Sequence, residues 1–348
     1  MTIDDATATN PSLRTGPPTG PRPAAIHERD EPTLFHSEPW RRAVEATFGV
    51  RIDEFVPTSE PAGIAYYSLL SDVRGERIVC TPFSDVCDPL LGPVGWREFA
   101  DHLQSMELPI TIRPFRCQPA ITDHSFERRH ELLWHGIDLR EGHEPVWDGL
   151  RSKVRTAIRR APKQGITLRA SSRLDDLKTF HAMHVELRKS KYRLLAQPFE
   201  FFAALHDGFG HDLLVITAED HSGPVASMVY LAWNGVWYYK FSASLPRGYR
   251  PNAAMIIEAC RHGAERGLQL LDLGRSDRDQ PGLVSFKQQF ASEELPLTTL
   301  HWQPDGPADP AGNAAGELLG AVTELLTAPD VPNEVTAAGG DLLYRYFA

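Results

Sequence analysis

One stretch decides the fold of this chain: Leu268–Phe290, with the sequence LQLLDLGRSDRDQPGLVSFKQQF. The apolar run Leu270–Leu273 is followed directly by Gly274, which is typical of a buried strand and its exit turn. Further along, apolar residues recur at helical spacing, as on one face of a short helix, at Leu283, Phe286 and Phe290. The stretch therefore predicts a strand, a polar loop and a short helix in that order.

Three charged residues lie on these elements. Asp272 and Arg275 flank the exit of the predicted strand, and Lys287 lies on the predicted helix, away from the centre of its apolar stripe. One interpretation makes them structural: a turn acceptor, its surface partner and a solvated lysine. In the other interpretation the strand brings Asp272 and Arg275 to a loop beside Lys287, and the three form a catalytic group.

Length and charge limit the classes of protein that this chain can be. It has 348 residues, enough for two domains, and its formal net charge of −10 argues against a dedicated DNA-binding protein. Residues 1–33 are rich in Pro, Thr, Ala and Gly and lack apolar periodicity, so we expect them to be disordered. They carry no signal-peptide pattern, and no run is long enough to cross a bilayer. The sequence thus favours a cytoplasmic protein without a membrane span.

Metal and cofactor motifs are missing from the sequence. The cysteines contain no CxxC pair, and their spacing supports neither a zinc site nor a disulfide framework: Cys80, Cys87, Cys117 and Cys260. Neither a Walker loop nor a dinucleotide fingerprint is present. We therefore expect no metal and no bound cofactor.

Strand and helix patterns alternate along the chain and predict an α/β fold with mixed sheets. The first domain opens with a helix whose expected cap is Ser37, with Pro39 in its first turn. The order of elements then returns in a second domain, which the strand Leu297–Trp302 is expected to close. The predicted parts are a disordered segment at 1–33, an N-terminal domain at 34–143, a C-terminal domain at 144–305 and a helical tail at 306–348.

A basic stretch follows the connector between the predicted domains. The predicted helix Val146–Ala161 carries Arg151, Arg155 and Arg159 along one edge, and no acidic residue interrupts the chain from Arg151 to Arg173. In an acidic protein this is a local positive field, which suits the phosphates of a nucleotide-bearing substrate or of tRNA. The alternative is a solvated helix face.

A second positive feature is the loop Leu245–Asn252, between a predicted strand and a predicted helix. Arg247 and Arg250 supply side-chain charge, and the helix start at Asn252 offers backbone N–H groups to an anion. Pro251 removes one of these donors.

Several motifs in these stretches resemble FemA/FemB-like transferases. The residues that carry the resemblance are Leu271–Asp277, Gly282–Leu283, Phe286–Lys287, Tyr238–Ser244 and Arg250–Asn252. Members of that family are tandem GNAT-fold proteins that join an aminoacyl or acyl group to an amine. The resemblance implies two tandem GNAT-like domains plus C-terminal helices, with the active cleft mainly in the second domain.

The resemblance also implies roles for single residues. Lys287 is the expected positive group near an oxyanion or a substrate phosphate, with Asp272 orienting it or Arg275. These three are the candidate catalytic residues. Substrate contacts are expected from Tyr239, Lys240, Arg247, Arg250, Asn252, Phe286, Arg151, Arg155 and Arg159.

Donor and acceptor are inferred less directly. The loop before Asn252 departs in spacing from the acyl-CoA pyrophosphate pattern and contains Pro251, so we expect an aminoacyl-tRNA donor, with acyl-CoA as the alternative. The acceptor is expected to be a small amine or a cell-wall precursor. The helical-hairpin insert of the staphylococcal members has no counterpart here, which leaves peptidoglycan, polysaccharide and natural-product pathways open. A third interpretation is a non-catalytic module that binds a nucleotide-linked ligand.

Overall fold

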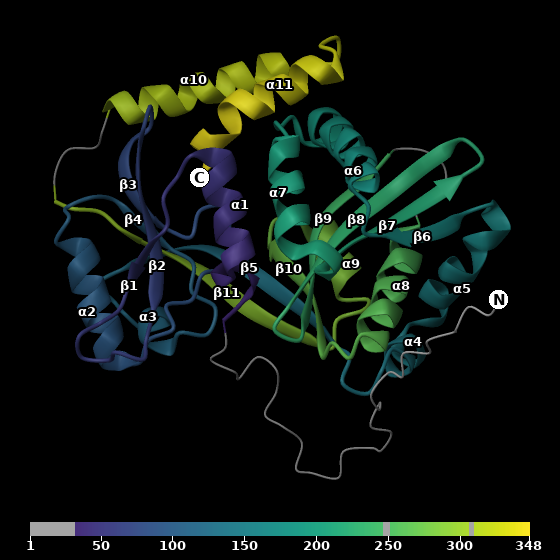
Figure 1. Ribbon diagram of the computed structural model, residues 1–348, viewed down its shortest axis with the longest axis horizontal. Helices are drawn as coiled ribbons and strands as arrows, with labels where there is room; N and C mark the ends of the chain where they lie inside the picture. The colour runs from purple at the N-terminus through teal and green to yellow at the C-terminus, as the bar shows by residue number, and fades with distance from the viewer. Residues whose placement is uncertain (1–31, 246–250, 306–309) are drawn as a thin grey trace, which may run out of the picture.

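The computed structural model describes residues 32–245, 251–305 and 310–348 (Figure 1). Within these ranges the strands form one eleven-stranded sheet in the order β1-β2-β3-β4-β11-β5-β10-β9-β8-β7-β6. The strands are β1 Asp53–Phe55, β2 Ala65–Asp72, β3 Gly75–Cys80, β4 Ile110–Ile112, β5 Glu127–Asp138, β6 Thr167–Ser171, β7 Leu213–Asp220, β8 Gly223–Trp233, β9 Val236–Ser244, β10 Leu270–Asp277 and β11 Glu293–Trp302. The helices are α1 Glu38–Phe48, α2 Pro93–Gln104, α3 Gln118–Ile121, α4 Glu144–Gly149, α5 Ser152–Arg160, α6 Leu174–Leu187, α7 Phe199–Phe209, α8 Asn252–Glu265, α9 Pro281–Lys287, α10 Pro310–Leu326 and α11 Asn333–Leu343.

The sheet has an N-terminal half, which begins with β1–β4, and a C-terminal half, which contains β6–β10. Two long strands, β5 and β11, lie between them and join the two halves (Figure 1). β11 pairs antiparallel with both β4 and β5, and β5 pairs antiparallel with β10. The expectation that Leu297–Trp302 closes the second domain is therefore wrong, because β11 pairs with β4 and β5, which belong to the predicted N-terminal domain. The sheet runs continuously through both halves, and the division at residues 143/144 remains our proposal.

The C-terminal half buries both faces of its sheet. Successive side chains of a strand point to opposite faces, so Val229 of β8 lies in the core formed with α6 and α7, whereas Met228 and Tyr230 lie in a second core formed with α5 and α8. The apolar run in β8 is thus explained by helices on both sides, as in the α/β fold expected from the sequence.

Helix α1 begins as its sequence predicts. The side chain of Ser37 accepts a hydrogen bond from the Trp40 N–H at 3.3 Å, and a proline lies in the first turn. Trp40 is fully buried, and its ring packs edge-on against Phe201 of α7 with 5.5 Å between ring centres. Helix α1 therefore ties the N-terminal half to the C-terminal half.

The predicted helix Val146–Ala161 is in fact two helices, α4 and α5. The backbone is extended at Leu150 (ψ 140°) and Arg151 (ψ 142°), which separates them. Gly149, a weak helix former, ends α4, and Leu150 then turns into the second core, where it is 3% exposed. Arg155 and Arg159 lie on α5, and Arg151 is its N-cap residue, so the break does not separate the three.

The tail forms helices α10 and α11, which lie together along one edge of the molecule (Figure 1). Helix α11 starts at Asn333, and Leu342 near its end is 71% exposed, so this side chain does not hold the helix in place. The contact is made instead by close backbone approach at Gly340 and by the ring of Tyr344, 5.9 Å from that of Phe48. None of the described helices is both long and apolar enough to span a membrane.

Substituting Gly340 tests how α11 is held. A Cβ at this position would lie 2.3 Å from the backbone oxygen of Ala196, which cannot move aside as a side chain can. We expect Gly340→Ala to lower the free energy of unfolding by about 1–3 kcal/mol, as overpacking does. Urea denaturation measures this change.

Gly320→Ala is the matched control, because Gly320 lies inside α10 and a Cβ added there would meet nothing within 4 Å outside its own helix backbone. There the alanine should stabilise the helix by about 0.5–1 kcal/mol. Equal unfolding midpoints for the two variants would contradict the close packing at Gly340.

Candidate active site

The site lies where the two halves of the sheet meet, and its first element is an ion pair between them. Asp85, in the loop between β3 and α2, accepts a hydrogen bond from Lys240 of β9, with 2.7 Å between Oδ2 and Nζ. The Lys240 side chain is only 8% exposed, and its ammonium lies 4.9 Å from the ring centre of Phe35 and 5.2 Å from that of Trp40. The carboxylate and the aromatic faces together stabilise a charge that burial disfavours.

Two further cations act on Asp85. Arg275 Nε is 3.8 Å from Asp85 Oδ1, and Lys287 contributes through its charge. Burial by itself would raise the pKa of Asp85, but the charges of Lys240, Arg275 and Lys287 outweigh burial and hold that pKa below its usual value. Asp85 is therefore ionised at neutral pH.

Lys287 is buried, so its interpretation as a solvated helix residue is wrong. It is 4% exposed, and its Nζ donates hydrogen bonds to the backbone oxygens of Gly274 at 3.1 Å and Arg275 at 2.7 Å. The last turn of α9 packs against β10, which is why this side chain meets the strand and not water. Burial lowers the pKa of Lys287 to about 8, although Asp85 and Asp272 oppose that change.

A β-bulge in β10 sets the positions of these groups. The strand continues through Asp277, so the prediction of a loop at Arg275–Asp277 is wrong, and its pairing with β5 shifts register between Asp272 and Arg275. Gly274 in this bulge has φ +69°, where a residue with a side chain would be strained. The bulge leaves the carbonyl groups of Gly274 and Arg275 available to Lys287.

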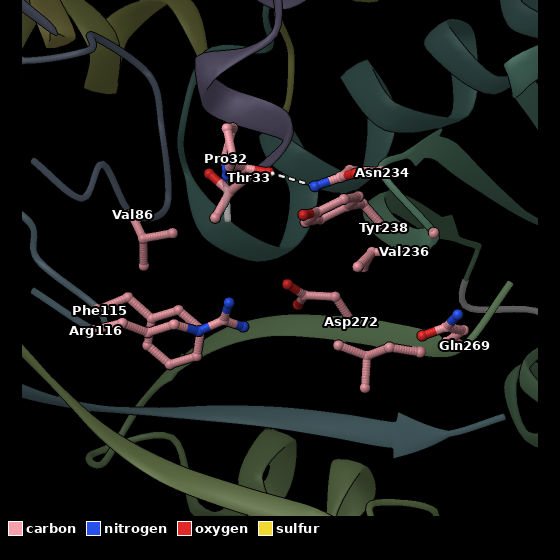
Figure 2. A pocket seen from close by; sticks show the side chains of 12 residues that line it. Pro32, Thr33, Val86, Phe115, Arg116, Asn234, Val236, Tyr238, Gln269 and Asp272 are labelled. Atoms are coloured by element: carbon pink, nitrogen blue, oxygen red, sulfur yellow. Dashed lines mark hydrogen bonds between the residues drawn. The ribbon is translucent and has the colours of Figure 1, made fainter. Parts of the chain in front are cut away.

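Asp272 presents a carboxylate to two adjoining clefts. Its Oδ1 accepts a hydrogen bond from the Gly274 N–H at 2.6 Å, within the bulge. Burial raises the pKa of Asp272 to about 6. Figure 2 shows its side chain pointing into the cleft that Tyr238 and Arg116 also line. Asp272 is thus a group that titrates near neutral pH and that lines both clefts.

Both clefts lie between the two halves of the molecule. The Asp272 cleft contains about 490 Å³ of empty space, its open mouth included, and is lined from both sides by Thr33, Val86, Phe115, Arg116, Asn234, Tyr238 and Asp272 (Figure 2). The Asp85 cleft contains about 290 Å³ measured in the same way, and its polar wall consists of Asp85, Tyr239, Lys240, Asp272 and Arg275. Residues of both halves therefore line each cleft.

The structure brings together five of the residues singled out in the sequence. Asp272, Arg275 and Lys287 meet around the bulge, and Lys240 reaches the same place through Asp85. Tyr239 lines the Asp85 cleft; burial raises its pKa to about 12, so the phenol is neutral and can only donate or accept hydrogen bonds.

Other candidates lie elsewhere. Phe286 packs in the second core against Phe290, with 5.4 Å between ring centres, and Asn252 accepts a hydrogen bond from Ser244 at the start of α8. Arg247 and Arg250 fall outside the described residues. The remaining three candidates do not line either cleft, and their contact with phosphates stays a prediction: Arg151, Arg155 and Arg159.

Sequence reasoning missed the contribution of the N-terminal half. Asp85 belongs to no motif, and its partner Lys240 is 155 residues away, so only the paired halves reveal the contact. Trp134 of β5 also lines the Asp85 cleft and was not among the candidate site residues. Among the described residues, no group of three or more His, Cys, Asp or Glu side chains is arranged to hold a metal ion.

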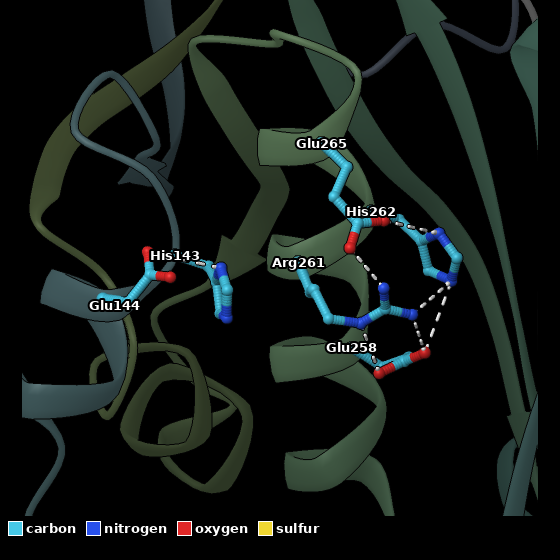
Figure 3. Close-up of polar contacts among 6 residues, drawn as sticks. All are labelled: His143, Glu144, Glu258, Arg261, His262 and Glu265. Carbon is cyan, nitrogen blue, oxygen red and sulfur yellow. Dashed lines mark hydrogen bonds and ion pairs between the residues drawn. The ribbon is translucent and has the colours of Figure 1, made fainter.

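A second group of polar contacts lies on the surface of α8 and is structural. Arg261 pairs with Glu258 at 2.6 Å and with Glu265 at 2.5 Å, one helical turn away on each side, and His262 lies beside them (Figure 3). Pairs at this spacing stabilise a helix by a few tenths of a kcal/mol, on the order of 0.2–0.5. None of these residues lines the two clefts.

Comparison with known proteins supports the same fold. Residues 149–287 match the family model described as an acetyltransferase (GNAT) domain, and no curated protein matches the sequence. Among solved structures, FemX is similar over 84% of this chain and 94% of its own, with 12% identity and a TM-score of 0.57. The C-terminal DUF2156 domain of a protein from Agrobacterium fabrum, described as a lysylphosphatidylglycerol synthetase, is similar over 83% of this chain and 93% of its own, with 13% identity and a TM-score of 0.54.

These similarities confirm the fold class inferred from the sequence. The matched GNAT family model covers α5 to α9, which carry Lys240, Asp272, Arg275 and Lys287, and the FemX likeness extends over both halves of the sheet. Residues 149–287 therefore match a GNAT acetyltransferase domain, and the fold of the chain is similar to that of FemX.

Proposed function

We propose that this protein is an N-acyltransferase of FemA/FemB-like type, which forms an amide between an activated aminoacyl group and an amine. One observation carries the proposal: the Asp272 carboxylate, with a pKa of about 6, faces a cleft between the halves and lies within a bulge held by the buried Lys287. A base that titrates near neutral pH beside fixed positive charge is what amide formation from an amine requires.

The reaction divides between these groups. The amine of the acceptor attacks the carbonyl carbon of the donor, and Asp272 accepts the proton that the nitrogen loses. Negative charge then develops on the carbonyl oxygen, and Arg275, whose side chain is 42% exposed, contacts it from the wall of the Asp85 cleft. When the tetrahedral intermediate collapses, the proton passes from Asp272 to the leaving oxygen or sulfur of the donor.

Lys287 and Asp85 support this arrangement without serving as the base. Two of the three N–H donors of Lys287 are used by the carbonyls of the bulge, so the lysine fixes Asp272 and Arg275 and adds a positive charge behind them. Asp85 is unsuited to accept a proton, because its pKa is held below the usual value and its Oδ2 is bonded to Lys240.

We propose aminoacyl-tRNA as the donor. Helix α8 starts at Asn252 directly after Pro251, which has no N–H, so this helix offers a pyrophosphate one donor fewer than usual. An acyl-CoA donor is the second candidate, favoured by the match of residues 149–287 to an acetyltransferase domain family. A small amine or a cell-wall precursor is the proposed acceptor.

The proposed roles give a bell-shaped pH dependence of kcat. Asp272 must be deprotonated, so turnover should rise as the pH passes about 6, and Lys287 must be charged, so turnover should fall as the pH passes about 8. Deprotonation of the acceptor amine would act in the opposite direction at high pH. A fall there is therefore diagnostic of the enzyme.

Substitutions of Asp272 and Lys287 test which residue causes the rise of kcat near pH 6 and which causes its fall near pH 8. Asp272→Asn should lower kcat by about 10²–10⁴-fold and abolish the rise near pH 6. Lys287→Met should lower kcat about a hundredfold, and Lys287→Arg should move the falling limb to higher pH. Lys178→Met, at a lysine whose side chain is 59% exposed on α6, is the control and should leave the profile unchanged. Near-normal turnover in folded Asp272→Asn would refute its role as base.

The Asp85–Lys240 pair makes a prediction about stability. Asp85→Asn leaves the Lys240 ammonium, 8% exposed, without its carboxylate, so we expect a loss of about 3–5 kcal/mol in the free energy of unfolding. Adding Lys240→Met to that variant should restore most of the loss. The control is Asp53→Asn, which removes the partner of the exposed Arg51 and should cost no more than about 1 kcal/mol. An Asp85→Asn variant as stable as the control would mean that Lys240 does not depend on this carboxylate.

A donor assay tests the reaction itself. The protein is incubated with a panel of amines and either a mixture of aminoacyl-tRNAs or acyl-CoA, with ribonuclease added to a parallel sample. We expect amide formation that requires the aminoacyl-tRNA and is abolished by ribonuclease. Turnover that survives ribonuclease and depends on acyl-CoA would select the second candidate. With no amide from either donor under conditions where the protein is folded, the enzyme proposal fails.

A further inference from the structure

A third cleft adjoins the candidate active site and is lined by arginine. Its charged residues are Arg128 and Arg129, at the start of β5, and Arg278, directly after β10. Apolar wall is supplied by Phe115 and Leu297, among others, and the empty space measures about 780 Å³ with the mouth included. Among the lining residues that the structure describes, none is acidic, although the whole chain has a formal net charge of −10.

Shared walls connect the arginine cleft to the site. Phe115 lines both the arginine cleft and the Asp272 cleft, and Leu297 lines both the arginine cleft and the Asp85 cleft. Arg278 also follows closely after Arg275 in the same segment of chain. A substrate held in the arginine cleft therefore lies one side chain away from the cleft that Asp272 enters.

All three arginines are exposed and have protein groups as neighbours. Arg129 donates to Glu127 at 2.8 Å, but the two side chains are 44% and 62% exposed, and such surface pairs contribute about 0–1 kcal/mol. Arg128 donates to the backbone oxygen of Ile121. Arg278 has Glu294 as an electrostatic neighbour, and that carboxylate is itself bonded to His135 and Gln288. The exposed Arg129 guanidinium can exchange such a surface partner for a ligand oxyanion at little cost.

We propose that the arginine cleft binds an oxyanionic group, a phosphate or a carboxylate, on the acceptor substrate while the amine of that substrate reaches Asp272. This inference rests on the proposed function for the identity of the substrate. Guanidinium groups suit oxyanions because their N–H groups form paired, charge-assisted hydrogen bonds. Neither Pro251 nor Asn252, at the start of α8, lines the arginine cleft.

Binding of two simple probes tests the site without any turnover. Inorganic pyrophosphate represents the phosphate source and tricarballylate the carboxylate source, and isothermal titration measures Kd for each. The variant Arg128→Gln/Arg129→Gln/Arg278→Gln should weaken binding of the preferred probe at least tenfold. All three residues are exposed, and each single Arg→Gln variant, expected to weaken binding by about threefold, serves if the triple variant proves unstable.

The control removes the same charge from another surface. Arg42→Gln/Arg51→Gln/Arg97→Gln replaces three exposed arginines of the N-terminal half that line none of the three clefts. Retained binding in this control, with loss in the arginine-cleft variant, supports the proposal, and the probe that binds tells phosphate from carboxylate. The proposal is overturned if neither probe binds the wild type, or if both triple variants bind alike.

The result is independent of the reaction. Asp272→Asn should bind the preferred probe as the wild type does, even though it lacks turnover. If amide formation fails with both donors while the probe still binds through the three arginines, the anion site stands and the proposed reaction falls. If amide forms but the triple arginine variant binds the probe as tightly as the wild type, the proposed reaction is supported and the proposed anion site is refuted.

Discussion

The candidate site depends on one buried ion pair, Asp85 with Lys240, which joins the two halves of the molecule at 2.7 Å. Lys240, Arg275 and Lys287 all act on this carboxylate, so three cations converge where the halves meet. Two of these cations, Lys240 and Lys287, are largely buried, which is unfavourable without a fixed anion. Asp85 supplies that anion from the N-terminal half, and its low pKa keeps it charged. Residues 149–287, which match the GNAT domain, therefore do not contain the whole site, because Asp85 lies outside them.

The β-bulge in β10 fixes the positions of Asp272 and Lys287 relative to each other. The bulge at Gly274 directs one N–H to Asp272 and two carbonyl groups to Lys287, so the base and the buried cation are fixed by the same short piece of backbone. Opposite shifts follow from the shared burial: the pKa of Asp272 rises to about 6 and that of Lys287 falls to about 8. Between these values both groups are in the charged forms that the proposed reaction uses.

Local sequence patterns predicted several helices and strands, whereas the arrangement of the candidate site depends on contacts between residues far apart in the sequence. The cap at Ser37 and the strand that starts at Leu270 follow from neighbouring residues, and both are present. The bulge could not be predicted from the sequence, because it depends on the pairing of β10 with β5 and not on the sequence of β10 alone. Asp85 was missed for the same reason, since no local signal marks a residue whose partner is 155 positions away. The break at Leu150 followed from burial, which outweighed helical periodicity.

The division of the site between the halves has a consequence for specificity. The GNAT family model matches residues 149–287, which hold the proposed base and its supporting cations, whereas the walls of the clefts come largely from elsewhere: Phe115, Arg116, Arg128 and Leu297. On the proposed function, the chemistry resides in the matched domain and acceptor choice in the N-terminal half and β11. Changes in those walls would then alter the acceptor without disturbing Asp272, because the bulge that holds it is bonded within β10 and to α9. That separation fits a fold in which function is set by the site and not by the scaffold.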